Sequence, residues 1–497
     1  MGTILWHDYE TGGTDPAVDR PFQFAAVRTD EDLAEVGEPL CLYCRPTLDW
    51  LPHPEACLVT GISPQRAERL GLPEPAFAAA VHEALSVPGT CGAGYNSLRF
   101  DDEVTRHLLY RNFFDPYERE WRDGNSRWDI IDMVRLVRAL RPTALRWPEE
   151  DEEGGVSLRL EDLTAANGIE HGAAHDALAD VRATLALARL IRQRLPGLYR
   201  YVYDHRLKQR VAPLVDPATR KPFFHVSGRL PRRNRHAALM IPLAWHPQNR
   251  NSVICFNLDR DPRPLLELDA ASLRERLFAP AGEAAEERPA LKEVHLNRCP
   301  VVVTPRILDE AAARALGIDL ERCERHWRLL RDRDLGDKLA AVYGFPSFEG
   351  RERDVERALY DGFPPESDRA LLAAVRAAAP QDLRELEGRF CDRRYRELLF
   401  RRRARHHPET LSAGEAERFR ALCRRWLAEG EDGRLALADF AARLAALSAG
   451  ADAREAALLA ELRAWGERVA RAAGLSYPPI NSRGAAPGSG PPVAGGS

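Results

Sequence analysis

Two carboxylates near the N-terminus have the spacing that metal-dependent catalysis needs. Asp8 and Glu10 close an apolar run that begins at Thr3. In an extended strand, side chains two residues apart share one face, so both carboxylates would point into the same pocket. A divalent cation with hard oxygen ligands would relieve their repulsion. A D-x-E pair is also common on the polar face of an edge strand, so this pair needs partners before it indicates a site.

Two later segments supply candidate partners. Asp101 and Asp102 follow a turn-rich run at the start of an expected helix, where one aspartate could cap the helix but two are not required. His175 and Asp180 form an H-x4-D pair, with the histidine just before a second expected helix. Each has a structural alternative, since an aspartate in a first turn also complements the helix dipole. Taken in order, the segments provide the partners that the D-x-E pair requires.

The elements that must position these residues form an α/β or mixed α+β pattern over residues 1–195. The apolar spacing predicts strands at 3–9 and 22–28 and helices at 75–85, 101–113 and 176–195. Pro196-Gly197 is expected to stop the last helix. An acidic, glycine-containing stretch at 149–155 is expected to be an exposed loop.

The chain changes character twice after residue 195. Residues 196–348 carry short β-like runs broken by Pro, Asn and Asp, which indicates a small β-rich domain. Residues 352–475 are rich in Ala, Leu, Arg and Glu, which favours an all-α domain. Residues 476–497 lack the apolar content to fold and are expected to be a disordered tail. A chain of 497 residues is long enough for three such domains, each with its own core.

The composition indicates a cytoplasmic protein with reduced thiols. No apolar stretch approaches the roughly 18 residues that span a bilayer, and no signal sequence opens the chain. Nine cysteines, an odd number, do not form a disulfide framework. Cys41 and Cys44 make a C-x-x-C, but they lie in a strand-like run without a second pair at zinc-ribbon spacing, so zinc is not expected there.

The net charge of -4 hides two basic segments. Residues 205–250 contain ten Lys or Arg against one acid, Asp216, and a second basic run covers residues 393–407. Either segment could be an ordinary solvated face. Beside a candidate metal site, they favour a phosphate-rich partner.

The motifs, taken together and in order, resemble a known superfamily. D-x-E on a first strand, N-x3-F-D at a helix start and H-x4-D on a late helix are similar to the DEDD 3′ exonucleases, and the histidine marks the DEDDh branch. The match resembles the bacterial exodeoxyribonuclease I family in particular, over about residues 3–470. That resemblance implies an RNase H-like exonuclease domain, an SH3-like domain and a helical domain. It rests on segments 7–11, 94–96, 99–106, 125–129, 166–171, 242–247 and 359–363.

The resemblance implies a two-metal mechanism with two Mg2+ ions, for which Mn2+ is a plausible substitute. Two ions about 3.5 to 4 Å apart can stabilise both the attacking and the leaving oxygen of a phosphodiester. By resemblance, Asp8 bridges the ions, Glu10 and Asp180 complete the site for the attacking water, and Asp101 supports the second ion. His175 is then the general base. Glu10 would also accept a hydrogen bond from the terminal 3′-hydroxyl.

The resemblance also implies residues that contact the substrate, each matched to a position of the family. Arg159 matches a family position that binds substrate, although it could form a surface ion pair with the acidic loop. Arg106 and Trp121 match positions near the single strand. Arg106 could instead be an ordinary exposed helix residue, and Trp121 could instead be a core residue. The basic segment, with Arg232, Arg233 and Arg235, would line a channel that the helical domain closes, which would favour processivity.

The predicted activity is Mg2+-dependent 3′ to 5′ degradation of single-stranded DNA to 5′-mononucleotides, in repair and recombination. The family also binds the acidic C-terminal tail of the single-strand-binding protein, and Arg141 and Tyr201 match two positions of that contact. A monomer without membrane contact is expected. Two alternatives are a DEDDh exonuclease that acts on RNA or in proofreading, and a non-catalytic single-strand-binding protein.

Overall fold

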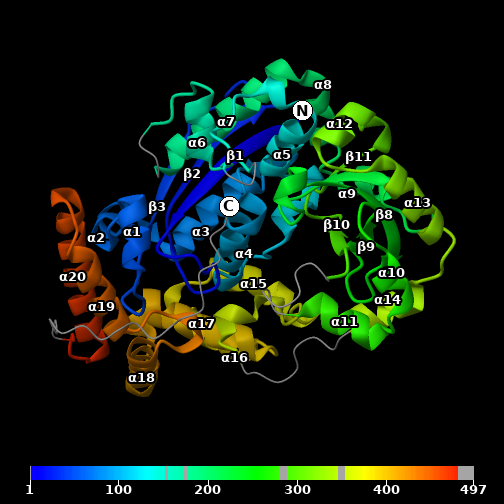
Figure 1. The fold of residues 1–497 in the computed structure, drawn as a ribbon. Helices are drawn as coiled ribbons and strands as arrows, with labels where there is room; N and C mark the ends of the chain where they lie inside the picture. The colour runs from blue at the N-terminus through cyan, green and yellow to red at the C-terminus, as the bar shows by residue number, and fades with distance from the viewer. Residues whose placement is uncertain (1, 152–154, 173–175, 280–287, 345–352, 479–497) are drawn as a thin grey trace.

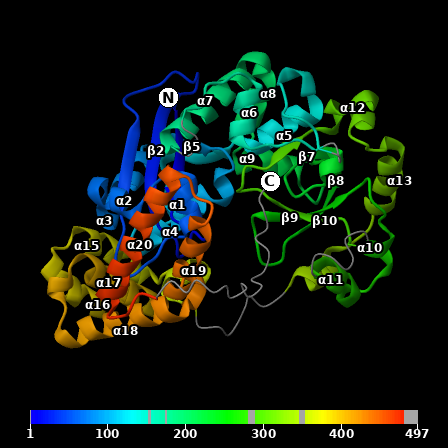
Figure 2. The same cartoon turned by 60° about the vertical axis from the view of Figure 1, so that its left-hand side comes forward.

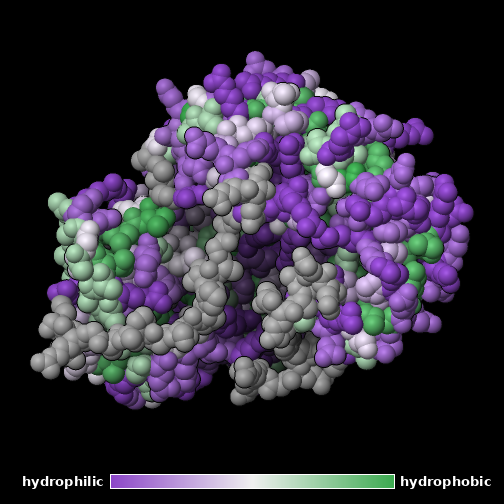
Figure 3. Space-filling view, viewed as in Figure 1, coloured by the Kyte–Doolittle hydropathy of each residue, from purple (hydrophilic) through white to green (hydrophobic). Residues whose placement is uncertain are grey.

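The structure is a computed structural model that describes residues 2–151, 155–172, 176–279, 288–344 and 353–478. Figure 1 shows three groups of elements: a sheet with its helices at the upper left, a second sheet on the right, and a layer of helices below. The face drawn in Figure 3 is hollowed between these groups, and the side chains visible in the hollow are mainly hydrophilic.

The first sheet is mixed and places the D-x-E pair on its central strands. Its order is β4-β3-β2-β1-β5-β6; β1 runs antiparallel to β2 and parallel to β5. Asp8 and Glu10 are therefore not on an edge strand, and the edge-strand alternative is wrong. The strands are β1 (Thr3–Thr11), β2 (Pro21–Asp30), β3 (Leu40–Arg45), β4 (Leu72–Pro73), β5 (Thr90–Gly94) and β6 (Ser126–Asp129).

Helices cover this sheet at the predicted places. The helix expected at 176–195 is α7, which packs against β1 and β2. It ends at Arg194 as expected, but Pro196 opens a new helix rather than a loop, because proline is tolerated at the first helical position. The helices are α1 (Pro54–Thr60), α2 (Pro64–Leu70), α3 (Glu74–Leu85), α4 (Asp101–Arg111), α5 (Ile131–Leu140), α6 (Leu160–Ala166), α7 (Ala177–Arg194) and α8 (Pro196–Asp204).

The second sheet is antiparallel throughout, with the order β10-β9-β8-β7-β11. This agrees with the predicted β-rich segment, but the helices around the sheet were not predicted. The strands are β7 (Phe223–Val226), β8 (Ala237–Trp245), β9 (Ser252–Asn257), β10 (Leu291–His295) and β11 (Val301–Val303). The helices are α9 (Lys208–Val211), α10 (Arg263–Glu267), α11 (Ala270–Phe278), α12 (Glu310–Ala315), α13 (Leu320–Leu330) and α14 (Gly336–Tyr343).

The described residues after 352 form helices only, as predicted. Figures 1 and 2 show that α20 lies beside α1 and α2, so the last helix packs on the first sheet's domain. Of the expected tail, residues 479–497 lie outside the described residues. The elements are the 3-10 helix η8 (Val355–Tyr360), then α15 (Glu366–Ala377), α16 (Leu383–Arg389), α17 (Arg393–His406), α18 (Ala413–Glu429), α19 (Leu437–Ser448) and α20 (Ala453–Ala473). None of the described helices is long and apolar enough to cross a membrane.

The basic run at 393–407 is largely internal, which corrects the expectation that it favours a phosphate-rich partner. Arg401, Arg403 and Arg405 on α17 are buried or nearly so, and each contacts carboxylates. Most of those carboxylates come from distant parts of the chain, such as Asp49 and Asp354. The positive charge is therefore neutralised inside the protein rather than presented to a ligand.

Candidate active site and nucleic-acid groove

Three of the predicted carboxylates meet at one point of the first domain. Oxygen atoms of Asp8, Glu10 and Asp180 lie within 4.8 Å of one another. The strand β1 supplies the first two, because residues two apart share a face, and the first turn of α7 supplies the third. The resemblance to the DEDDh exonucleases implies the same three residues as metal ligands.

Asp101 borders this cluster from the start of α4. Its Oδ1 accepts a hydrogen bond of 3.1 Å from the backbone N–H of Tyr9, which lies between the two carboxylates of β1. Neither Asp101 nor Asp102 caps the helix, so the capping alternative is wrong. Asp102 turns away into a buried pair of guanidinium groups, 2.5 Å from Arg119 and 2.8 Å from Arg127.

The cluster is electrostatically unfavourable without a cation. Burial raises the pKa of Asp8 well above its usual range, and the negative charges of Asp101, Glu10 and Asp180 raise it further. Burial and the same kind of repulsion raise the pKa of Glu10 to about 9. Burial is also the main cause that raises the pKa of Asp101 to about 8. Carboxyl groups in such a site hold protons at neutral pH unless a cation replaces them.

The donor set fits hard divalent cations, since it consists of carboxylate oxygens only. In the described parts of the chain, no other group of His, Cys, Asp or Glu side chains comes together in this way. The C-x-x-C pair lies on β3 as expected, with Cys41 exposed and Cys44 buried, and both thiols are free.

The proposed general base, His175, lies outside the described residues. A different histidine, which the sequence analysis did not single out, contacts the cluster. The Nε2 atom of His171 lies 2.5 Å from Asp180 Oδ1, and its Nδ1 lies 3.2 Å from Thr164 Oγ1. Asp176 caps α7 by accepting from the N–H of Leu178 at 3.0 Å. The resemblance already included His171 in segment 166–171, which was the signal available for it.

A groove of about 580 Å3 runs between the first domain and the second sheet. Asn96, Arg99 and Glu103, which flank Asp101 in the chain, form one wall. The other wall carries cationic side chains of the second domain, and Tyr360 of η8 also lines the groove. The cations on that wall are Arg229, Lys292 and Arg298.

The predicted substrate residues have different surroundings. Trp121 is 63% exposed, so the core alternative is wrong. Arg106 is buried and bonds Glu120 through two nitrogens, at 2.7 and 2.9 Å, and Glu103 at 2.7 Å, so its guanidinium is already occupied by carboxylates. Arg159 is exposed and pairs with Glu161, which belongs to α6 rather than to the acidic loop.

Other predicted contacts lie away from the groove wall. Of the arginines expected to line a channel, Arg232 pairs with Asp151 at 2.9 Å and lies with Arg235 in a separate small crevice. Arg141 is exposed at the end of α5. The hydroxyl of Tyr201 on α8 donates to the carbonyl oxygen of Val302 at 3.1 Å.

Family models match nearly the whole chain. They are an exonuclease model at residues 5–188, an exonuclease I SH3-like domain at 206–345 and an exonuclease I C-terminal domain at 353–469. Exodeoxyribonuclease I of Escherichia coli is 46% identical over 421 residues, which cover 84% of this chain and 88% of the relative. The chain belongs to the exodeoxyribonuclease I family. It is thus a nuclease with an α/β exonuclease domain, an SH3-like domain and a helical C-terminal domain.

Solved exonuclease I structures have the same fold. E. coli exonuclease I in complex with a dA16 oligonucleotide superimposes with a TM-score of 0.89 and 42% identity, over 94% of this chain and all of that chain. A structure of SSB and exonuclease I with the inhibitor CFAM superimposes with a TM-score of 0.85 and 43% identity, over the same shares. The described arrangement of three domains is therefore shared with these exonucleases.

Proposed function

We propose that this exodeoxyribonuclease I removes 5′-mononucleotides processively from the 3′ end of single-stranded DNA, with two Mg2+ ions at the carboxylate cluster. The observation that carries the proposal is the meeting of Asp8, Glu10 and Asp180 within 4.8 Å. Asp101 at the edge of the cluster completes the set of four carboxylates that balances two divalent cations. The complex of E. coli exonuclease I with a dA16 oligonucleotide supports DNA as the substrate of this chain. The role in repair and recombination follows from the resemblance.

When bound, the ions would lower the pKa of a water molecule and neutralise charge on the leaving oxygen. The residues of the chain orient and hold the reactants around them. Asp8 lies close enough to Asp101, Glu10 and Asp180 for all three charges to raise its pKa, so it would contribute to holding both ions. Glu10 would accept the hydrogen bond of the 3′-hydroxyl, and His175 would accept a proton from the attacking water. His171 would hold Asp180 in place through its 2.5 Å contact.

Single-stranded DNA would follow the groove between the first domain and the second sheet. Cations on the far wall, Arg229, Lys292 and Arg298, would contact phosphates. Exposed aromatic rings would stack on bases: Trp121, and Phe363, whose ring centroid is 5.8 Å from that of Tyr117. Arg159 would exchange its ion pair with Glu161 for two parallel hydrogen bonds to a phosphate. Arg106 would act mainly by holding Glu120 and Tyr360 in place.

Arg141 and Tyr201 would contact the acidic tail of the single-strand-binding protein, which the SSB complex of a relative supports. The domain limits 1–195, 196–348 and 352–475 are supported by the residues that the family models match. All nine cysteines are free thiols, which supports a reducing, cytoplasmic compartment, and a monomer is expected.

The decisive experiment uses end-labelled single-stranded DNA, duplex DNA and RNA, with and without Mg2+. The proposal requires 5′-phosphorylated mononucleotides from the 3′ end of single-stranded DNA, and no product with EDTA or with Asp8→Asn. RNA degraded as fast as DNA would favour the RNA or proofreading alternative. Tight binding without hydrolysis would favour the non-catalytic alternative.

A further inference from the structure

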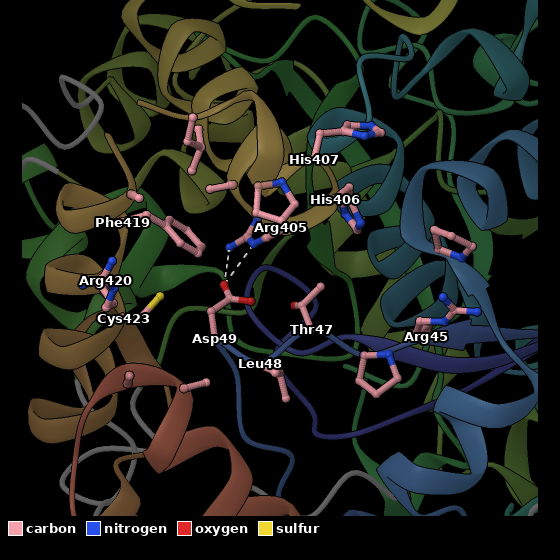
Figure 4. Close-up of a pocket in the computed structure, with 18 of the residues that line it drawn as sticks. Arg45, Thr47, Leu48, Asp49, Arg405, His406, His407, Phe419, Arg420 and Cys423 are labelled. Atoms are coloured by element: carbon pink, nitrogen blue, oxygen red, sulfur yellow. Dashed lines mark hydrogen bonds and ion pairs between the residues drawn. The ribbon is translucent and has the colours of Figure 1, made fainter. Parts of the chain in front are cut away.

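A second cavity, of about 600 Å3, lies between the exonuclease domain and the C-terminal helices. Residues 45–49, which end β3 and follow it, form one wall, and α17, α18 and α20 form the other. Figure 4 shows the view into this cavity, with Phe419 and Arg420 on one side and Arg45 on the opposite side. Its lining includes no residue of the carboxylate cluster or of the groove. Its volume lies within the roughly 300 to 1,000 Å3 that is usual for small-molecule sites.

The charge of the lining favours an anion. The lining carries four arginines and two acids, but Arg405 and Asp49 neutralise each other. Three arginines, Arg45, Arg420 and Arg468, remain against one acid, Glu68. Arg45 is exposed and forms no direct salt bridge in the described parts of the chain. Its charge does reach Glu68, whose pKa is lowered mainly by the hydrogen bond from Arg468 and further by Arg45. Arg420 and Arg468 each pair with one glutamate, yet nearly half of each side chain stays exposed. Guanidinium groups of this kind can bind a phosphate through two hydrogen bonds.

The remaining lining suits a flat ring. Most of it is apolar, and Phe419 contributes an aromatic ring that projects from α18. Burial lowers the pKa of His406 to about 4, so its imidazole is neutral at pH 7 and can donate or accept one hydrogen bond without adding charge. No hydrogen-bond partner of this ring is found within the described residues. A ligand with a phosphate and a polar-edged aromatic ring would use all of these groups.

We propose that this cavity binds a nucleoside 5′-monophosphate. The choice of ligand rests on the proposed function, because that reaction releases one such molecule in every cycle. The phosphate would contact Arg45 at one wall, and the base would lie against Phe419 at the other. Inorganic phosphate would leave the apolar lining unfilled, and a fatty acid would leave the imidazole unpaired.

Binding would act on the contact between the two domains. Arg405, in the cavity wall, bonds Asp49 of the exonuclease domain at 2.8 Å and Glu356 of the C-terminal domain at 2.6 Å. A ligand that touches both walls binds only when the walls are together, so it stabilises the closed arrangement by mass action. The enzyme would thus be held closed by its own product while degradation continues.

The test is titration of the full chain with deoxyadenosine 5′-monophosphate by calorimetry, in EDTA and in the Asp8→Asn background. These conditions remove product binding at the metal site. One molecule should bind per chain, and the melting temperature should rise with ligand concentration. Arg45→Gln and Phe419→Ala should each weaken binding about tenfold or more. Arg418→Gln, on the same helix and paired with Glu397 away from the cavity, is the matched control and should leave affinity unchanged.

Several results would overturn the proposal. They are an absence of binding at millimolar ligand, equal affinity in the cavity variants, and inorganic phosphate or deoxyadenosine binding as tightly as the nucleotide. The exonuclease activity of Phe419→Ala, measured with Mg2+ in a chain that retains Asp8, shows whether that variant is folded. Binding by a chain that proves inactive on DNA would support the cavity site and refute only the proposed function.

Discussion

The individual carboxylates of the active site illustrate how function opposes stability. Asp8, Glu10, Asp101 and Asp180 repel one another in a buried place, and the pKa of each of the first three is raised. A fold selected for stability alone would not gather them. The site therefore depends on cations for its charge balance. Without them, the repulsion between the carboxylates lowers the stability of the folded protein.

The metal-free protein should lose stability as pH rises. The pKa of Glu10 is about 9 in the folded protein against an ordinary value of 4.5, and that of Asp101 is about 8 against 3.8. Between about pH 4 and 9 the folded state therefore holds more protons than the unfolded state, so the free energy of unfolding falls with increasing pH. Melting temperatures in EDTA from pH 5 to 9 should show this fall. Mg2+ should abolish it, and Asp8→Asn should weaken it; parallel curves in all three samples would contradict the prediction.

Trp121 should contribute to DNA affinity without contributing to the fold. Its side chain is 63% exposed, so Trp121→Ala should leave the melting temperature nearly unchanged. Loss of one stacked base should weaken single-strand binding by about 1 to 3 kcal/mol, measured by fluorescence anisotropy in EDTA. Leu329→Ala, at another exposed apolar residue on α13, is the control. An equal effect of both variants would remove Trp121 from the DNA path.

At the scale of elements, the N-terminal cap of α7 helps to position a carboxylate of the candidate active site. Asp176 caps α7, and Asp180 lies one turn later in the carboxylate cluster. Asp176→Ala should cost about 0.5 to 2 kcal/mol of stability and should also lower kcat, because the first turn positions Asp180. Asp452→Ala removes the cap of α20 and should cost a similar amount of stability without lowering kcat. Asp176→Ser, which retains a cap, should restore activity; equal kcat in all variants would contradict this role.

The elements also show what could be predicted from the sequence. Strand and helix periodicity predicted β1, β2, α4 and α7, because these elements depend on local spacing. Asp180 was assigned to the site of Asp8 and Glu10 only through the resemblance to the exonuclease family, since their meeting is a tertiary contact. The environments of arginines could not be predicted in this way. Arg106 and the arginines of α17 are bound by carboxylates whose positions depend on tertiary packing. Most helices of the second domain have 4 to 9 residues, too few to give a clear helical period. The 11-residue helix α13 is strongly amphipathic, so its pattern was present in the sequence and was overlooked.

At the scale of the whole molecule, one buried carboxylate joins the C-terminal domain to the exonuclease domain. Glu356 on η8 is fully buried and lies 2.7 Å from Arg20, 2.6 Å from Arg405 and 3.4 Å from Arg434. Burial would raise the pKa of Glu356, but these arginines hold it well below its usual range. The same short helix ends at Tyr360, whose hydroxyl donates to Glu103 on α4 at the groove. The short helix η8 therefore links the domain contact at Glu356 to the groove at Tyr360.

Glu356→Gln should uncouple the two domains. Removing the charge leaves several arginines buried without their partner, which should cost about 3 to 5 kcal/mol of stability. We expect nucleotides released per binding event to fall, while the excision rate on saturating DNA changes little, because the carboxylate cluster is intact.

Glu55→Gln is the matched control: it removes an exposed ion pair with Arg443 across the same domain contact, where the loss should be at most about 1 kcal/mol. Processivity is measured with a labelled strand and an excess of unlabelled trap DNA. A lowered melting temperature with an unchanged run length would make Glu356 a stabilising residue only, and would separate closure of the C-terminal domain from retention of DNA.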